Sequence, residues 1–301
     1  MAVPLITTIS REQARVVNQV VPIPLPVNPL SWIMLTLQVT AGAVSPSLNE
    51  LLGAFRNIEV LFKGTSIFSC NGVDLGRMQQ ALGGRPVPVF GFNNVAPNLI
   101  RFNLLIPFGR VPWWPEEAFP PTRSGELTLR LTYAAAFTNF TLPIETVTTG
   151  EILDAAPKRF LKVTTVFDQA VAIGDRAQVD LPIGNPILGV LLFGTTFPGA
   201  AMTSTIRRLT LKLDNVESQY SQVEHDPLLA LPMYRLDFPV HYDPLDTDWA
   251  QHLYLDFDPM RDGSYALRTE GRAKVQLEFR ADAADAVRVL PVELITLAGG
   301  A

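Results

Sequence analysis

Apolar and polar residues alternate along Gly125–Tyr133 and again along Gly271–Phe279. The apolar residues fall at the same places in the two segments. A period of two is typical of a β-strand with one buried face, because successive side chains point to opposite faces of a sheet. Each segment is therefore predicted to form a half-buried strand.

Further segments repeat in the same order in the two halves of the chain. They are Leu25–Leu30 with Leu181–Ile187, Phe55–Phe62 with Ile206–Leu213, and Leu142–Glu145 with Leu290–Glu293. The first pair is followed in each half by a strongly apolar run, Trp32–Leu37 and Leu188–Phe193. The spacing between matched segments varies, as it does when loops change length while strands persist. Order and variation together indicate two diverged copies of one β domain.

Each half offers short strands separated by proline-rich turns, and the chain holds 25 prolines. This pattern favours a jelly-roll sandwich in each half. We predict an all-β fold of two tandem jelly rolls, with residues 1–152 in the first and residues 153–301 in the second.

Only a few short helices are expected. Ser47 and Glu50 have the spacing of a capping box at the start of a helix over Ser47–Ala54. A second helix is predicted over Asp74–Leu82, with Asp74 as its cap and a glycine pair, Gly83 and Gly84, at its end. Ser10 and Gln13 have the same capping spacing, which allows one helical turn in the amino-terminal arm.

The composition favours extensive contact with other protein. Hydrophobic residues make up 48% of the chain and charged residues only 18%, against roughly 25% charged in ordinary globular domains. The net charge of −5 argues against direct binding to nucleic acid, which relies on clustered Lys and Arg. The longest uncharged stretches are broken by Pro and Gly, so no transmembrane helix is expected. The single cysteine, Cys70, is interpreted as a small buried hydrophobe.

The candidates for chemistry are weak. A double-barrel metal enzyme needs clustered histidines, but His225, His241 and His252 include no close pair. Neighbouring acids such as Glu116 and Glu117 usually point in different directions within a loop, which argues against a glycosidase pair. We therefore predict no catalytic residues, no metal site and no cofactor.

An acidic group in the second half invites a calcium interpretation. It comprises Asp243, Asp246, Asp248, Asp256, Asp258 and Asp262. The EF-hand pattern fails because Met260 stands where an oxygen ligand is needed. Solvated loop charge is the favoured interpretation, and a loosely held cation between subunits is the alternative.

Aromatic residues in one proline-rich loop are candidates for a subunit contact. The loop residues are Arg110, Trp113, Trp114 and Phe119. Large apolar side chains in a loop mark contact with other protein when they are exposed. Packing between subunits or barrels is the favoured interpretation. Folding back over the barrel end and stacking on carbohydrate are the alternatives.

Two series of segments carry a resemblance to a known family. The first is Ile58–Leu82, with Phe62–Ile67 followed by Gly72–Leu75 before the predicted helix. The second is Asn103–Gly109, the loop 110–123 with its Pro121-Thr122 turn, and the strand at Gly125. Tyr234–Pro239 and His252–Phe257 occupy comparable places in the second half, without the Pro-Thr turn. Over its whole length the chain resembles the double jelly-roll major capsid proteins of tailless icosahedral phages and adenovirus-like viruses, many of which enclose a membrane.

The resemblance implies a structural protein and not an enzyme. Three copies would form a homotrimer whose six barrels make a pseudo-hexagonal capsomer of an icosahedral virion, assembled in the host cytoplasm. The implied partners are further copies of the chain, minor capsid and penton proteins and, in the members that enclose one, an internal lipid membrane. The alternative is a double β-sandwich that binds or acts on carbohydrate, which should be monomeric or dimeric with an open cleft.

Overall fold

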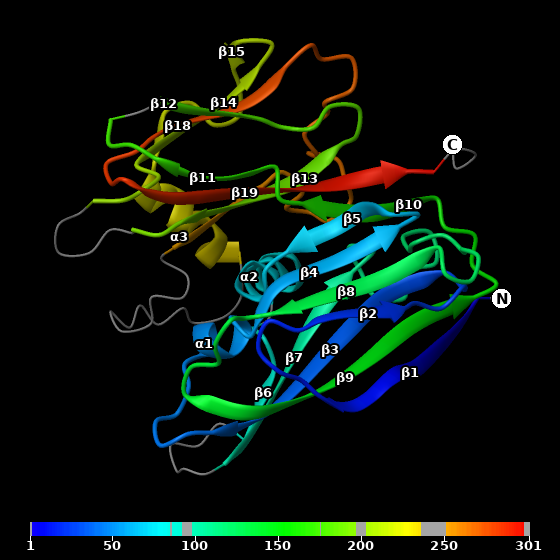
Figure 1. Ribbon diagram of the computed structural model, residues 1–301. Helices are drawn as coiled ribbons and strands as arrows, with labels where there is room; N and C mark the ends of the chain where they lie inside the picture. The colour runs from blue at the N-terminus through cyan, green and yellow to red at the C-terminus, as the bar shows by residue number, and fades with distance from the viewer. Residues whose placement is uncertain are drawn as a thin grey trace. The chain divides into compact units, whose positions relative to one another are not determined.

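The computed structural model describes residues 2–84, 86–91, 98–174, 176–196, 203–235 and 251–297. The chain divides into two compact units (Figure 1). Unit 1 comprises Met1–Lys162 with Ile295–Ala301, and unit 2 comprises Val163–Leu294. The predicted jelly-roll limits, 1–152 and 153–301, stay a prediction.

Unit 1 is built from two antiparallel sheets. The first has the order β1 (Val3–Ala14), β9 (Phe140–Leu153), β3 (Leu30–Ala41), β7 (Leu99–Pro107) and β6 (Val89–Phe90). The second has the order β2 (Val20–Pro24), β8 (Leu127–Tyr133), β4 (Phe55–Phe62) and β5 (Thr65–Cys70), with β10 (Arg159–Thr164) beside β5. Burial alternates along β3 from Ile33 onward and along most of β7, as the period-two pattern requires.

Unit 2 is built in the same way. One sheet contains β11 (Phe167–Val171), β19 (Asp285–Thr296), β13 (Ile187–Gly194) and β17 (His252–Asp256), in that order. The other contains β12 (Arg176–Asp180), β18 (Val275–Arg280), β14 (Arg208–Leu213) and β15 (Val216–Glu217), and the short β16 (Val223–Glu224) also pairs with β14. The apolar faces of the strands meet in one core that includes Leu192, Leu211, Leu255 and Phe279.

The two units share one connectivity. When the described strands of each unit are numbered along the chain, with β6, β10 and β16 left out, one sheet has the order 1-8-3-6 and the other 2-7-4-5. Strands that alternate between two sheets in this way form a jelly roll. The all-β double jelly-roll prediction is thus confirmed.

Equivalent backbone contacts support the duplication. Leu30 exchanges two backbone hydrogen bonds with Phe119, and Ile187 exchanges two with Leu267, at 2.8–3.0 Å. Leu30 lies opposite Glu151 and Ile187 lies opposite Glu293, and each pair is followed by a shift in register. A bulge at the same place in both copies is a shared feature of the fold.

The tight hairpins of the two units also correspond. Lys63 and Gly64 join β4 to β5 with φ of 50° and 81°, and Asp214 and Asn215 join β14 to β15 with φ of 51° and 69°. Two central residues with positive φ characterise the type I′ turn, which matches the twist of the flanking strands.

Two of the sequence matches were wrong in register. Leu127 and Val275 occupy equivalent places, since the backbone carbonyl of each accepts a hydrogen bond from the residue that directly follows the second strand of its unit, Leu25 or Leu181. The sequence match had paired Leu127 with Ala273 instead. A shift of two residues keeps every side chain on its face, so alternation alone cannot detect it.

The match of Leu142–Glu145 with Leu290–Glu293 was also displaced. Both segments lie on the last strand of their unit, β9 and β19. Glu293, however, corresponds to Glu151, because both lie opposite the first residue of the third strand. The shared Leu-Pro-x-Glu letters therefore do not mark equivalent positions.

The predicted helices are present with one corrected cap. Helix α1 (Leu48–Leu52) has the reciprocal capping box between Ser47 and Glu50. Helix α2 (Gly72–Gly83) ends at Gly84 with φ of 67°, but its cap is Asn71, whose side chain accepts from the Asp74 amide. Asp74 lies inside the first turn, where a carboxylate favours the helix dipole.

Two further helical segments differ from expectation. The amino-terminal arm forms strand β1 instead of the helical turn allowed at Ser10, because its backbone pairs with β9. Helix α3 (His225–Arg235) had no prediction. Within the described ranges, no helix is long and apolar enough to cross a membrane.

Candidate assembly surfaces

The loop after β7 in unit 1 is closed by a buried ion pair. Arg110 Nε lies 3.0 Å from both carboxylate oxygens of Glu117, and the Arg110 amide donates to the same carboxylate at 3.2 Å. Arg159 adds a contact to Glu117 at 3.1 Å. The Arg110 and Glu117 side chains are only 1% and 0% exposed. Neighbouring Glu116 instead pairs with Lys158 at the surface, so the two acids do not converge.

The aromatic residues of this loop pack onto their own unit. The Trp113 amide donates to Ser31 Oγ at 2.9 Å, and the Trp113 ring meets the Trp32 ring edge-on at 5.4 Å. The Arg110 guanidinium lies 5.7 Å from the centre of the Trp114 ring. These contacts hold the loop against the unit from which it comes.

Phe119 belongs to the core of unit 1. Its ring is 1% exposed and contacts the rings of Phe62, Phe108 and Phe160 at 5.0–5.6 Å. Phe119 and Arg110 thus have almost no area left for a second subunit, whereas Trp113 and Trp114 are partly exposed. Of the four residues predicted at a subunit contact, the two tryptophans stay candidates, and the contact itself stays a prediction.

An apolar cavity lies beside the loop. It has a volume of about 380 Å³, and Leu82, Pro86, Pro88, Leu105, Pro107 and Pro112 form much of its wall. Prolines provide apolar surface with little conformational freedom to lose on contact.

The outer face of the first sheet of unit 1 is polar but carries little charge. Thr36 Oγ1 donates to Asn103 at 2.7 Å, and Arg101 donates to Gln38 at 2.6 Å. Thr146 and Thr148 of β9 continue this face and are partly buried. Uncharged polar groups cost less to remove from water than charges do, so such a face suits contact with another protein.

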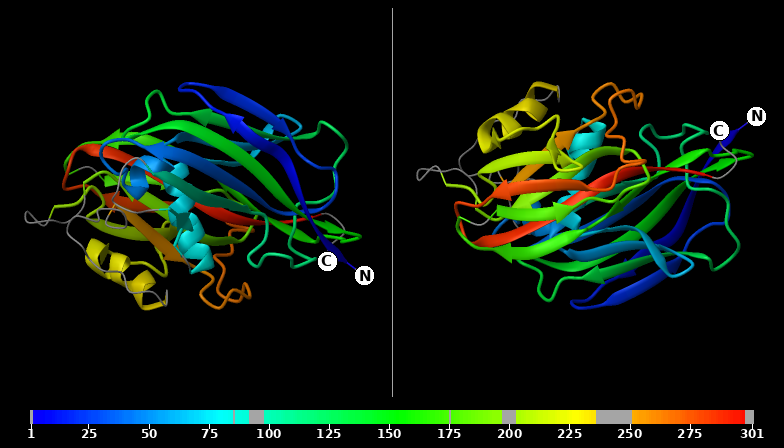
Figure 2. Two further views of the ribbon diagram at one scale, coloured as in Figure 1. Left: turned by 90° about the horizontal axis from the view of Figure 1, so that it is seen from below. Right: turned by 90° about the horizontal axis from the view of Figure 1, so that it is seen from above.

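Strand β1 forms one edge of that sheet (Figure 2). Val3, Leu5 and Ile6 are 47%, 39% and 63% exposed. Irregular register after Thr8 interrupts the strand. Bulges of this kind limit uncontrolled pairing at a sheet edge, so the regular stretch before Thr8 is the part suited to pairing.

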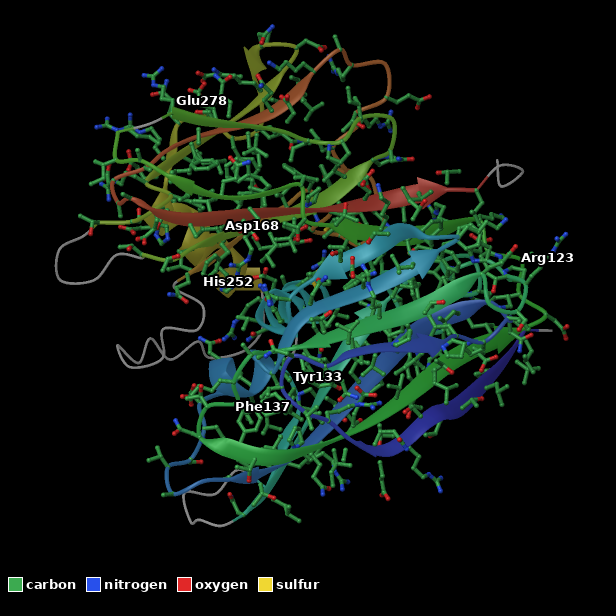
Figure 3. The ribbon with its side chains drawn as sticks, viewed as in Figure 1. Arg123, Tyr133, Phe137, Asp168, His252 and Glu278 are labelled. Atoms are coloured by element: carbon green, nitrogen blue, oxygen red, sulfur yellow. The ribbon has the colours of Figure 1, made fainter. Side chains whose placement is uncertain are left out.

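The buried carboxylate of Glu145 on β9 is held by two side chains of its own unit. Glu145 pairs with Arg15 at 2.9 Å and accepts from the Tyr133 hydroxyl (Figure 3). Burial, together with the Glu145 charge, raises the pKa of Tyr133 far above its ordinary value. The hydroxyl therefore stays protonated and serves as a donor to Glu145.

A second buried pair occurs once in each unit. Asn28 donates to Glu151 at 2.8 Å, and Asn185 donates to Glu293 at 3.3 Å. Each asparagine stands before a proline at the start of the third strand. The equivalent pairs indicate that these acids stabilise the repeated bulge.

Two of the histidines considered as metal ligands are buried beside other side chains of unit 2. His225 is buried next to Asp226 at 3.5 Å, and His252 of β17 packs against the Phe193 ring at 5.0 Å (Figure 3). His241 lies outside the described residues. Cys70 is buried, as predicted. The described ranges contain no group of three His, Cys, Asp or Glu side chains placed to hold a metal ion.

The acidic loop after β17 is internally hydrogen-bonded. Asp256 accepts from the Asp258 amide at 2.9 Å, Asp258 from the Gly263 amide at 2.7 Å, and Asp262 from the Ser264 amide at 2.8 Å. Asp258 is fully buried, so solvated charge was the wrong interpretation for this residue, whose carboxylate binds loop backbone instead of water. Asp243, Asp246 and Asp248 lie outside the described residues.

Comparison with known proteins gives matches only among solved structures. No family model matches the chain, and no curated protein sequence matches it. The major capsid protein of Sulfolobus turreted icosahedral virus superposes with a TM-score of 0.70 at 14% identity, over 97% of each chain. The major capsid protein P2 of bacteriophage PM2 has a TM-score of 0.67 at 11% identity, covering 99% of this chain and 98% of P2. A capsid chain of virus PBCV-1 has a TM-score of 0.67 at 12% identity, covering 100% and 96%.

These alignments extend over both units and over nearly the full length of each matched protein. They agree with the repeated strand order described above. The chain therefore has the double jelly-roll fold of these viral capsid proteins.

Proposed function

We propose that the chain is the major capsid protein of an icosahedral virion and that copies of it assemble with one another. The observation that carries this proposal is the end-to-end match of both jelly rolls to viral major capsid proteins. A fold can host several functions, but a duplicated jelly roll of matching total length narrows the choice.

The duplication suits a particular assembly. Three copies related by a threefold axis would present six similar barrels, so a trimer could fill a sixfold position in a closed shell. We propose this homotrimer as the pseudo-hexagonal capsomer. Capsomers would then contact one another through surfaces that have diverged between the two units.

The chemistry of unit 1 supports such contacts. Its buried acids are compensated inside the unit, and uncharged polar side chains such as those of Thr36, Gln38 and Asn103 lie on the outer face of its first sheet. The exposed edge of Trp113 and Trp114 adds aromatic area of the kind enriched at protein interfaces. We propose these residues as part of a subunit contact.

Other partners follow from the same proposal. Minor capsid and penton proteins would be further partners in the shell, an internal membrane could underlie it, and assembly would take place in the host cytoplasm. Carbohydrate binding is not favoured, because the solved structures that match both units end to end are viral major capsid proteins.

Light scattering of the purified full-length chain, with negative-stain images of the same fraction, tests the proposal. A compact particle of about three chain masses with a pseudo-hexagonal outline, or shells built from it, is expected. A stable monomer with an open cleft would contradict it and favour the carbohydrate-binding alternative.

A further inference from the structure

Three arginines form one row on the outer face of the second sheet of unit 2. The strand register places Arg176 of β12 opposite Arg280 of β18, and Arg280 opposite Arg208 of β14. Directly opposite residues project from the same face of a sheet. All three side chains line one open cavity of about 140 Å³.

The row is electrostatically unfavourable by itself. Like charges at directly opposite positions destabilise strand pairing. The side chains of Arg280 and Arg208 are 57% and 45% exposed, so water and salt weaken the repulsion without removing it. A bound anion would relieve it.

The carboxylates of Glu217 and Glu278 also line this cavity, and both are engaged by other groups. Glu217 accepts a hydrogen bond from the Ser221 hydroxyl. Glu224 pairs with Arg208 at 2.7 Å and with Arg207 at 2.9 Å. Glu278 accepts from Lys212 at 2.8 Å and from Gln178 at 3.0 Å (Figure 3). The Lys212 hydrogen bond, aided by Gln178 and by the charge of Arg176, holds the pKa of Glu278 below its ordinary value.

The Arg176 end of the row is the less compensated one. Arg280 Nε lies 4.0 Å from Asp282, at the outer limit of an ion pair. Arg176 acts on Glu278 through its charge. These two guanidinium groups therefore keep most of their capacity to bind an additional anion.

We propose that Arg176, Arg280 and Arg208 bind a phosphate group on the outer face of this sheet. A guanidinium donates two parallel hydrogen bonds to an oxyanion, and the oxygens of a phosphate can serve several such donors at once. The phosphate group can belong to the free ion or to a lipid headgroup. All three arginines belong to unit 2, so the inference does not depend on assembly of the chain.

Calorimetric titration of the full chain with inorganic phosphate at low salt tests the proposal. The double variant Arg176→Gln, Arg280→Gln keeps Arg208 with its Glu224 partner. The matched control is Arg268→Gln, an exposed arginine of the same unit. Saturable binding is expected in the wild type and in the control, and roughly tenfold or greater weakening in the double variant, since the charge-assisted hydrogen bonds of two guanidinium groups are lost.

Thermal unfolding gives a readout that is independent of the titration. Without phosphate, the double variant should unfold at the same temperature as the wild type or above it, because a repulsion has been removed. Phosphate should raise the unfolding temperature of the wild type and the control, but not that of the double variant. If the double variant does not fold, Arg280→Lys, which keeps the charge and loses the planar fork, should still bind phosphate more weakly than the wild type.

Vesicle flotation separates the two sources of the phosphate group. Binding to phosphatidic acid vesicles, but not to phosphatidylcholine vesicles, that is lost in the double variant would assign the site to a lipid headgroup if inorganic phosphate does not bind. Equal binding by wild type and double variant in both assays, or binding in neither, overturns the proposal. Binding only to a single-stranded oligonucleotide also overturns it, because a polymer and not a single phosphate would then be recognised.

Discussion

The Glu117 side chain has no exposed area, and hydrogen bonds and ion pairs compensate its negative charge. Arg110, the Arg110 amide and Arg159 all contact its carboxylate. Desolvation of a carboxylate is costly, and such compensation is what makes a buried acid tolerable. Glu145 is compensated in the same way, by an ion pair with Arg15 and a hydrogen bond from Tyr133.

Replacing Glu117 tests this compensation. Glu117→Gln should lower the free energy of unfolding by about 3 kcal/mol, because two arginines lose their buried counter-charge. The adjacent control Glu116→Gln removes only a surface pair with Lys158 and should cost less than about 1 kcal/mol. Urea unfolding followed by fluorescence measures both. Equal losses for the two variants would show that burial of the pair does not matter.

At the scale of strands, both units pack a large aromatic ring against a glycine near the repeated bulge, but they place the ring on different strands. In unit 1 the bulky Trp32 of β3 lies opposite Gly150 of β9. In unit 2 the equivalent position on β13 is Gly189, where a Cβ would meet the Tyr254 hydroxyl at 2.2 Å. Each unit thus pairs one large ring with a glycine at this bulge, but the ring comes from a different strand.

The packing at Gly150 leads to a prediction. A Cβ at Gly150 would lie 2.2–2.6 Å from atoms of the Trp32 ring, so Gly150→Ala forces the ring or the strand to move. We expect a loss of about 1–3 kcal/mol in the free energy of unfolding. Gly83→Ala is the control, since its Cβ meets nothing within 4 Å and lies in a helix. The control should match or exceed wild-type stability in thermal unfolding, and a Gly150→Ala variant as stable as this control would refute the clash.

At the scale of the whole molecule, assembly should depend on apolar area that the chain itself leaves uncovered. Arg110 and Phe119 are buried within unit 1, which leaves Trp113 and Trp114 as the partly exposed aromatic residues of the loop. Trp114 is the better probe, because Trp113 also anchors the loop to Ser31 and Trp32.

Trp114→Ser should therefore raise the protein concentration at which oligomers dissociate, while leaving the fold intact. Interface tryptophans commonly contribute about 2 kcal/mol or more, which corresponds to a roughly thirtyfold or larger change in the dissociation constant. Light scattering over a dilution series measures the change. Tyr265→Ser, which alters a 60% exposed ring in unit 2, is the control. Equal effects of the two substitutions would show that the loop has no special role in assembly.

Local pattern was sufficient for much of this architecture. Alternation located the strands at Phe55–Phe62 and Leu127–Tyr133, and the Ser47 capping box located α1. Duplication was visible because strand order and apolar faces survive changes in loop length. These features depend on residues close in sequence, so the amino-acid order alone determines them.

Other features were decided only by contacts between distant residues. Only the strand register shows that Glu293 is equivalent to Glu151 and that the match at Leu127 is shifted by two residues. A period-two pattern cannot detect such shifts, because a shift of two residues keeps every side chain on its face. The ion pair of Arg110 with Glu117 and the burial of Phe119 required the loop to close on its own unit. The arginine row of unit 2 likewise exists only because three separate strands align Arg176, Arg280 and Arg208. Sequence thus determined the elements and their repetition, whereas tertiary structure decided which side chains meet, because register and loop closure are set by packing across the whole sheet.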